Sequence, residues 1–151
     1  MVYSDVTAAQ VYFANGDLAS ARARQDASYT EWRARLSNEP TNAIATATVG
    51  QMEAVLGHAE EAVRLGRKAV ELVPESRDAV DGPYYLYDLA TVYAMNGAKD
   101  QAIAELGHVI LTPTTNNSVA LIRTDPALTK LHGDPRFEAL LNDPKNNAPL
   151  F

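Results

Sequence analysis

The side chains that could do chemistry are not arranged in any spacing that catalysis or metal binding requires. The three histidines, His58, His108 and His132, lie far apart in the chain and form no HExxH pair. The phosphate-binding patterns GxxxxGK and GxGxxG and the nucleophile pattern GxSxG are absent. Because there is no cysteine, thiol catalysis and cysteine-based zinc or iron–sulfur sites are excluded. We therefore expect no enzyme activity, no metal site and no cofactor.

The acidic balance of the chain argues against nucleic acid as a direct ligand. Its 151 residues carry a formal net charge of -6, and an acidic surface repels phosphate backbones. Four arginines, Arg22, Arg24, Arg33 and Arg35, make one segment locally basic. A solvated helix face explains these arginines better than an acidic partner does.

The chain carries no recognisable membrane or export signal. No stretch approaches the roughly 18 apolar residues of a spanning helix, so we expect no membrane insertion. The opening MVYSDVTAAQ lacks a basic segment followed by an apolar run, so no signal peptide is indicated. These features favour the cytoplasm, with the periplasm as the alternative if a targeting segment lies upstream.

Amphipathic helices are predicted along most of the chain, because apolar residues recur at spacings of three and four. Ser4 or Asp5, Asp17 and Thr41 precede such segments as N-caps, and Pro83 suits the first turn of another. The predicted helices span 4–14, 17–37, 41–56, 58–73, 83–96 and 98–111.

The C-terminal part of the chain has a different pattern. Asp-Pro occurs at Asp125, Asp134 and Asp143, and this pair places an N-cap before a proline at the first helical position. The pattern predicts short helical turns at 117–124, 126–132 and 135–142.

A glycine-centred unit recurs three times. Turn glycines stand at Gly16, Gly57 and Gly97. Alanine follows each glycine by five residues, and a small residue precedes each by seven. These small residues are Ala9, Ala21, Gly50, Ala62, Ala90 and Ala102. The same helix–turn–helix unit is therefore used three times, with small residues where its two helices cross.

This pattern resembles the tetratricopeptide repeat, whose unit has about 34 residues. The residues that carry the resemblance are Gly50, Gly57, Ala62, Ala69 and Pro74 in the second unit and Leu86, Leu89, Ala90, Tyr93, Gly97, Ala102 and Leu106 in the third. The resemblance implies an all-α superhelix, a single domain over 1–151. Its three units would cover about 2–40, 41–78 and 82–113, followed by a cap at about 116–142.

The C-terminal segment resembles the end of many bacterial tetratricopeptide arrays. The matching residues are Asp125, Pro126, Leu131, Asp134, Pro135, Arg136, Phe137, Leu140 and Leu141. Such endings occur in multidomain regulators, including serine/threonine kinases, nucleotide cyclases and winged-helix transcription regulators. The resemblance implies that this chain is the C-terminal interaction or sensory module of such a protein.

The resemblance also implies where a protein or peptide partner would lie. In this fold the first helix of each unit lines a concave groove, and aromatic, glutamine and threonine side chains there suit an extended peptide. The predicted groove residues are Tyr3, Gln10, Phe13, Ile44, Gln51, Val55, Tyr84, Tyr87, Thr91 and Met95. The competing interpretation is that the aromatic residues only pack in the core. A clamp for a chaperone's carboxylate is not expected, because these positions hold no cation.

Three functions follow from these patterns. The first is a non-enzymatic scaffold that binds a protein or peptide in the groove. The second is self-association, with a homodimer formed through the first helices, because the end of an array exposes an apolar edge. The third and least favoured is a small enzyme that uses a carboxylate in the groove.

Overall fold

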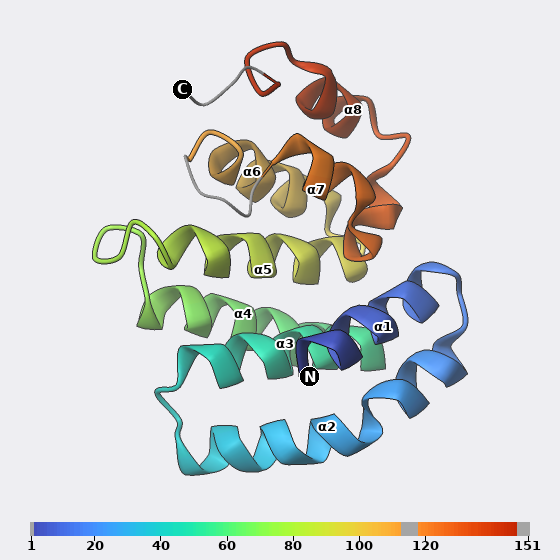
Figure 1. Ribbon diagram of the computed structural model, residues 1–151, viewed down its shortest axis with the longest axis vertical. Helices are drawn as coiled ribbons and strands as arrows, with labels where there is room; N and C mark the ends of the chain where they lie inside the picture. Colours follow the sequence, from blue (N-terminus) through green and yellow to red (C-terminus); the bar gives the residue numbers. More distant parts are fainter. Residues whose placement is uncertain (1, 113–117, 148–151) are drawn as a thin grey trace.

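The computed structural model describes residues 2–112 and 118–147, with side chains from residue 5 onward. The helices are α1 (Val2–Ala14), α2 (Leu18–Asn38), α3 (Ala43–Leu56), α4 (Ala59–Leu72), α5 (Gly82–Met95), α6 (Lys99–Val109), α7 (Val119–Thr124), the 3-10 helix η1 (Pro126–Leu131) and α8 (Pro135–Asn142). Within these ranges there is no strand, which confirms the all-α prediction (Figure 1).

Three glycines end the first helix of each pair, as predicted. Gly16, Gly57 and Gly97 have φ angles of 79°, 85° and 80°, a left-handed conformation that glycine adopts without a Cβ penalty. Each glycine reverses the chain so that the next helix packs back against the one before it. The short second helix of the third pair, α6, ends at Val109.

The aspartate caps form as predicted, whereas two other caps differ. Asp17 accepts a hydrogen bond from the backbone N of Ser20 at 3.0 Å. The cap of α3 is Asn42, one residue after Thr41, because its side chain reaches the backbone N of Ala45 at 3.0 Å. Helix α1 begins at Val2, so Asp5 lies inside it and caps nothing.

Small residues let the helices of each pair approach closely. Ala9, Ala21, Ala62, Ala90 and Ala102 are all completely buried. A Cβ built on Gly50 of α3 would lie 3.3 Å from the backbone of α4, at the carbonyl O of Ala62 and the N of Gly66. At this crossing the two helices therefore leave no room for a larger side chain.

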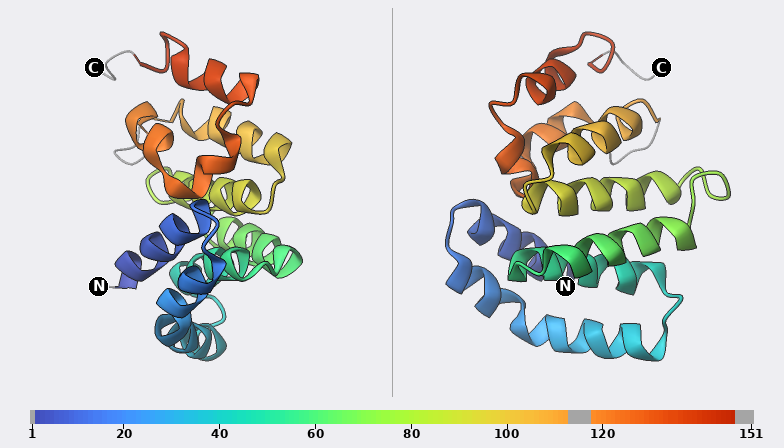
Figure 2. Two further views of the ribbon diagram at one scale, coloured as in Figure 1. Left: turned by 90° about the vertical axis from the view of Figure 1, so that its right-hand side faces the viewer. Right: turned by 180° about the vertical axis from the view of Figure 1, so that it is seen from behind.

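Helix α1 contacts helices other than its partner α2. Helix α1 packs against α2, crosses α3 and also contacts η1, while η1 in turn packs on α5. Helices α1 and α7 lie on one side of the stack and α4 lies on the other (Figure 2). The helices α1, α3, α5 and η1 thus form a closed ring of contacts.

One cation joins three members of this ring. The Lys130 ammonium of η1 donates to the carbonyl O of Met95, at the end of α5, at 2.6 Å. The same Nζ lies 4.7 Å from the ring centroid of Phe13 in α1, within reach of a cation–π attraction. This side chain ties the C-terminal segment to both the first and the third helix pair.

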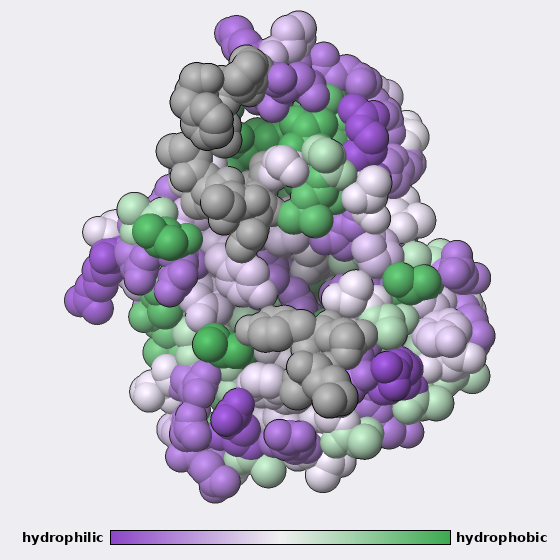
Figure 3. Space-filling model, in the orientation of Figure 1, coloured by the Kyte–Doolittle hydropathy of each residue, from purple (hydrophilic) through white to green (hydrophobic). Residues whose placement is uncertain are grey.

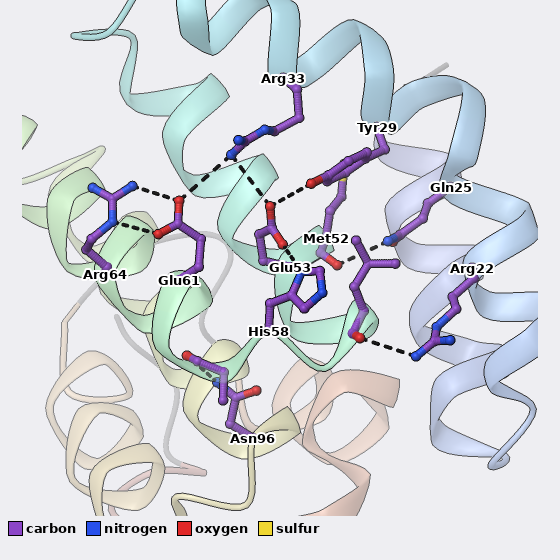
Figure 4. A network of polar contacts seen from close by, with 12 residues as sticks. Arg22, Gln25, Tyr29, Arg33, Met52, Glu53, His58, Glu61, Arg64 and Asn96 are labelled. Carbon is purple, nitrogen blue, oxygen red and sulfur yellow. Dashed lines mark hydrogen bonds and ion pairs between the residues drawn. The ribbon is translucent and has the colours of Figure 1, made fainter.

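The seam between α2 and α3 holds a polar network beside its apolar contacts (Figure 4). Glu53 of α3 is 3% exposed and accepts hydrogen bonds from Tyr29 Oη at 2.7 Å and His58 Nδ1 at 2.6 Å. Arg33 adds an ion pair at 3.5 Å. Three partners therefore satisfy this buried carboxylate, as a low-dielectric interior requires.

No helix in residues 2–112 and 118–147 has both the length and the apolar character needed to cross a bilayer.

Replacing Gly50 by leucine should destabilise the fold by about 1–3 kcal/mol, since the extra side chain must force α3 away from α4. Urea unfolding followed by circular dichroism measures this change. The matched control is Gly107→Leu in α6, where the nearest atom to a built Cβ is 4.0 Å away. That variant should change stability by less than about 0.5 kcal/mol. Equal effects of the two substitutions would contradict close packing at Gly50.

Candidate ligand-binding pocket

A cavity of about 190 Å³ lies between the helices of the ring formed by α1, α3, α5 and η1. It is enclosed by side chains from α1, α3, α5, α7 and the residue that caps η1. These side chains are Val6, Thr7, Gln10, Gln51, Tyr84, Tyr87, Asp88, Thr91, Leu121 and Asp125. The face that carries α1 and α7 has weakly polar residues at its centre and a more hydrophobic area towards the C-terminal helices (Figure 3).

Asp88 is the central charged group of this pocket. It is 8% exposed, and its Oδ1 accepts a hydrogen bond from Gln51 Nε2 at 2.7 Å. Its Oδ2 has no hydrogen-bond partner among the described residues. Burial raises the pKa of Asp88 to about 8, the Gln51 hydrogen bond opposes this rise, and the charge of Asp125 adds to it. Near neutral pH, Asp88 therefore holds its proton.

Tyr87 fixes the second carboxylate. Its hydroxyl donates to Asp125 Oδ2 at 2.5 Å, and Asp125 Oδ1 accepts from the backbone N of Ala127 at 2.8 Å as the cap of η1. Burial, and then the charge of Asp125, raises the pKa of the Tyr87 phenol. Tyr87 is therefore a neutral donor that holds the Asp125 carboxylate at the pocket wall.

Gln10 contributes an amide to the lining of the cavity. It is 6% exposed and lines the cavity, and its amide has no hydrogen-bond partner among the described residues. Thr91, by contrast, donates to the carbonyl O of Asp88 within its own helix at 2.7 Å. The Gln10 amide is therefore available to hydrogen-bond a ligand in the cavity.

Half of the predicted groove residues come together here. Gln10, Gln51, Tyr84, Tyr87 and Thr91 all line the pocket. They come from three helices that are distant in sequence, α1, α3 and α5.

The other predicted groove residues lie elsewhere. Val55 and Met95 are each 2% exposed in the apolar core, so in this structure they support the pocket without facing a ligand. Phe13 is half-buried against the Lys130 ammonium. Ile44 is 45% exposed and does not line the pocket. The side chain of Tyr3 lies outside the described residues.

Sequence reasoning missed the two carboxylates. It treated Asp125 only as a cap and gave Asp88 no role. One signal was available, because Asp88 is the only charged residue in the apolar sequence of α5. A charge at a position that the helix period buries needs a partner or a ligand.

A larger open groove of about 750 Å³ runs along α4 and the turn between α5 and α6. Its cations already have partners: Arg64 pairs with Glu61 at 2.7 Å and Arg67 donates to Tyr93 Oη at 3.0 Å. The smaller pocket, whose lining brings Gln10, Gln51 and Asp88 together, is the better candidate site.

Comparison with known protein families, with curated proteins and with solved structures finds no match for this chain.

Asp88→Asn should stabilise the protein more at about pH 8 than at about pH 5, by at least about 2 kcal/mol. In the wild type the folded carboxyl keeps its proton up to about pH 8, whereas the unfolded carboxyl loses it near pH 4. The wild type therefore loses folding free energy as the pH rises from about 4 to about 8. Asparagine does not ionise, so the variant does not lose this free energy. Urea unfolding of both proteins across the range measures the difference. The exposed Asp26→Asn serves as control, and a difference that does not vary with pH would contradict the assignment.

Proposed function

We propose that this protein is a non-enzymatic, protein- or peptide-binding scaffold with a tetratricopeptide-like superhelical fold. The ligand engages the pocket between α1, α5 and η1. The superhelical assignment is supported by three consecutive helix pairs, each with a left-handed glycine at its turn. The three pairs and the C-terminal segment all surround the same cavity.

The observation that carries the proposal is the polar lining of the cavity. The buried carboxylate of Glu53 is fully paired between α2 and α3. Gln10 and Asp88 instead present unused polar atoms to a cavity. Such convergent polar groups in a pocket are typical of a recognition site.

The size of the pocket favours one side chain over a whole small molecule. Its volume is about 190 Å³, less than the roughly 300–1,000 Å³ of pockets that hold drug-sized ligands. The contact between α1 and η1 narrows the concave face. We infer that a peptide crosses the mouth of the pocket and inserts a single side chain.

The C-terminal segment supports a role as the interaction or sensory module of a larger bacterial regulatory protein. Its Asp-Pro caps form at Asp125 and Asp134. Arg136 pairs with Asp134 at 2.9 Å and with Asp100 of α6 at 2.7 Å. These caps and ion pairs fall on residues of the array-ending pattern. The proposal of a kinase, cyclase or winged-helix partner domain rests on that pattern.

Thr7→Trp should abolish peptide binding while leaving the fold intact. Thr7 is exposed and lines the pocket, so an indole there blocks the mouth without entering the core. Peptides selected from a displayed random library on the wild type would be tested by calorimetry against the variant. Thr30→Trp, an exposed threonine of α2 outside the pocket, is the matched control. Binding that survives Thr7→Trp would place the ligand elsewhere.

Self-association is a second candidate function, because the first helix pair exposes apolar side chains. Val11, Tyr12 and Leu18 are 44%, 41% and 45% exposed. Tyr12 lies four residues before its turn glycine, as Glu53 and Tyr93 do in the other two units. Glu53 accepts a hydrogen bond from Tyr29, and Tyr93 accepts one from Arg67, in each case from the preceding helix pair. Within the described residues Tyr12 has no such partner, so a second copy could cover this edge.

Leu18→Glu tests this candidate. If two copies pair through the edge, sedimentation should show a concentration-dependent dimer of the wild type, and the buried charge should reduce it to a monomer. The exposed Leu111→Glu is the control. A wild type that stays monomeric at all concentrations would rule out self-association.

A further inference from the structure

We propose that the group that enters the pocket is a primary alkylammonium, supplied by a lysine side chain of the peptide partner. This inference rests on the proposed function and names the chemistry of the same site. It is carried by the charges, the free acceptor atoms and the walls of the cavity.

The charge of the lining favours a cation. The described residues that line the pocket include two carboxylates, Asp88 and Asp125, and no lysine, arginine or histidine. The nearest cations along the chain are used elsewhere: Arg123 donates to the carbonyl O of Leu141 at 3.2 Å, and Lys130 to that of Met95 at 2.6 Å. A bound cation meets no like charge in the lining and favours the ionised form of Asp88.

The free acceptors favour an ammonium over a guanidinium. Three side-chain oxygen atoms accept no hydrogen bond from the described residues. They are Asp88 Oδ2, Gln51 Oε1 and Gln10 Oε1. An ammonium has three donors and can point one at each of three acceptors. A guanidinium prefers both oxygens of one carboxylate, and Asp88 Oδ1 already accepts from Gln51 at 2.7 Å.

The walls suit the stem of a lysine side chain. Val6 of α1 and Leu121 of α7 give the cavity apolar sides, and Tyr84 adds an aromatic one. Lysine buries its methylene groups along apolar surface while its charged end reaches polar groups. A bare metal ion would make no use of these walls.

Binding should release a proton. The other titratable groups in the lining are Tyr84, Tyr87 and Asp125, while α1 and α3 contribute no titratable group to it. Burial and the charge of Asp125 raise the pKa of Tyr87, so this phenol stays neutral, and Asp88 is the group expected to change state. A cation favours its carboxylate form, and lysine, whose ordinary pKa is about 10.4, remains charged throughout. Affinity should therefore increase as the pH rises towards about 8.

Calorimetry with four capped tripeptides, Gly-X-Gly, tests the proposal. The central residue is lysine, norleucine, N-acetyllysine or arginine, each titrated to millimolar concentration. Lysine should bind at least about tenfold more tightly than the two neutral peptides, because its hydrogen bonds are charge-assisted. Its enthalpy should vary with the ionisation enthalpy of the buffer, which reports the released proton. Arginine should bind more weakly than lysine.

Two variants separate the roles of charge and amide. Asp88→Asn should remove the preference for lysine and the proton release, whereas the exposed Asp26→Asn should leave both unchanged. Gln10→Leu, which removes an amide acceptor from the lining, should weaken lysine binding while leaving the helical circular dichroism signal unchanged. This second variant keeps the test valid even if Asp88→Asn does not fold.

Three results would overturn the proposal. These are equal binding of lysine and norleucine, tighter binding of arginine, and stabilisation by Mg²⁺, Ca²⁺ or K⁺ with no effect of any amine. If library-selected peptides lose binding on Thr7→Trp but show no need for lysine, the proposed function stands and the lysine assignment fails. If Thr7→Trp has no effect on any peptide, both fail.

Discussion

Within each helix pair, the crossing depends on side chains small enough to let two backbones approach. Gly50 and Ala62 are in contact across α3 and α4, and Ala90 and Ala102 are completely buried in α5 and α6. Close approach gives many dispersion contacts for each small residue. It also limits how much apolar side chain the core can hold, so polar groups take part of the interior.

Two buried carboxylates show what this polar interior does. Glu53 accepts hydrogen bonds from a hydroxyl and an imidazole and forms an ion pair with a guanidinium, so its carboxylate is fully paired. These contacts hold α2 against α3. Asp88 has only the Gln51 amide as a side-chain partner. Both residues lie on the first helix of a pair, yet one is structurally satisfied and the other faces a cavity. The difference in their partners distinguishes a structural carboxylate from one that is available to a ligand.

Local chemistry made most of the helices predictable, because turn glycines and aspartate caps act within a few residues. The predicted turns at Gly16, Gly57 and Gly97 are present, as are the caps Asp17, Asp125 and Asp134. The pocket could be predicted only in part. The resemblance to the tetratricopeptide repeat implied that Gln51 and Tyr87 face the same groove, but it could not show that η1 returns to α1 or that Val55 and Met95 are buried in the core cluster that includes Ala9 of α1 and Ala127 of η1. The role of Asp88 depends on that long-range contact, which no spacing along the chain encodes.

The contact between α1 and η1 also has a consequence for folding. In a linear helical array each unit touches only its neighbours, so ends can unravel while the middle remains folded. Here the first helix packs against residues 126–131 near the other end of the described chain. Closing such a loop costs entropy before its contacts form, which slows folding and raises contact order. The same closure links the ends, so the molecule should unfold as one cooperative unit instead of fraying repeat by repeat.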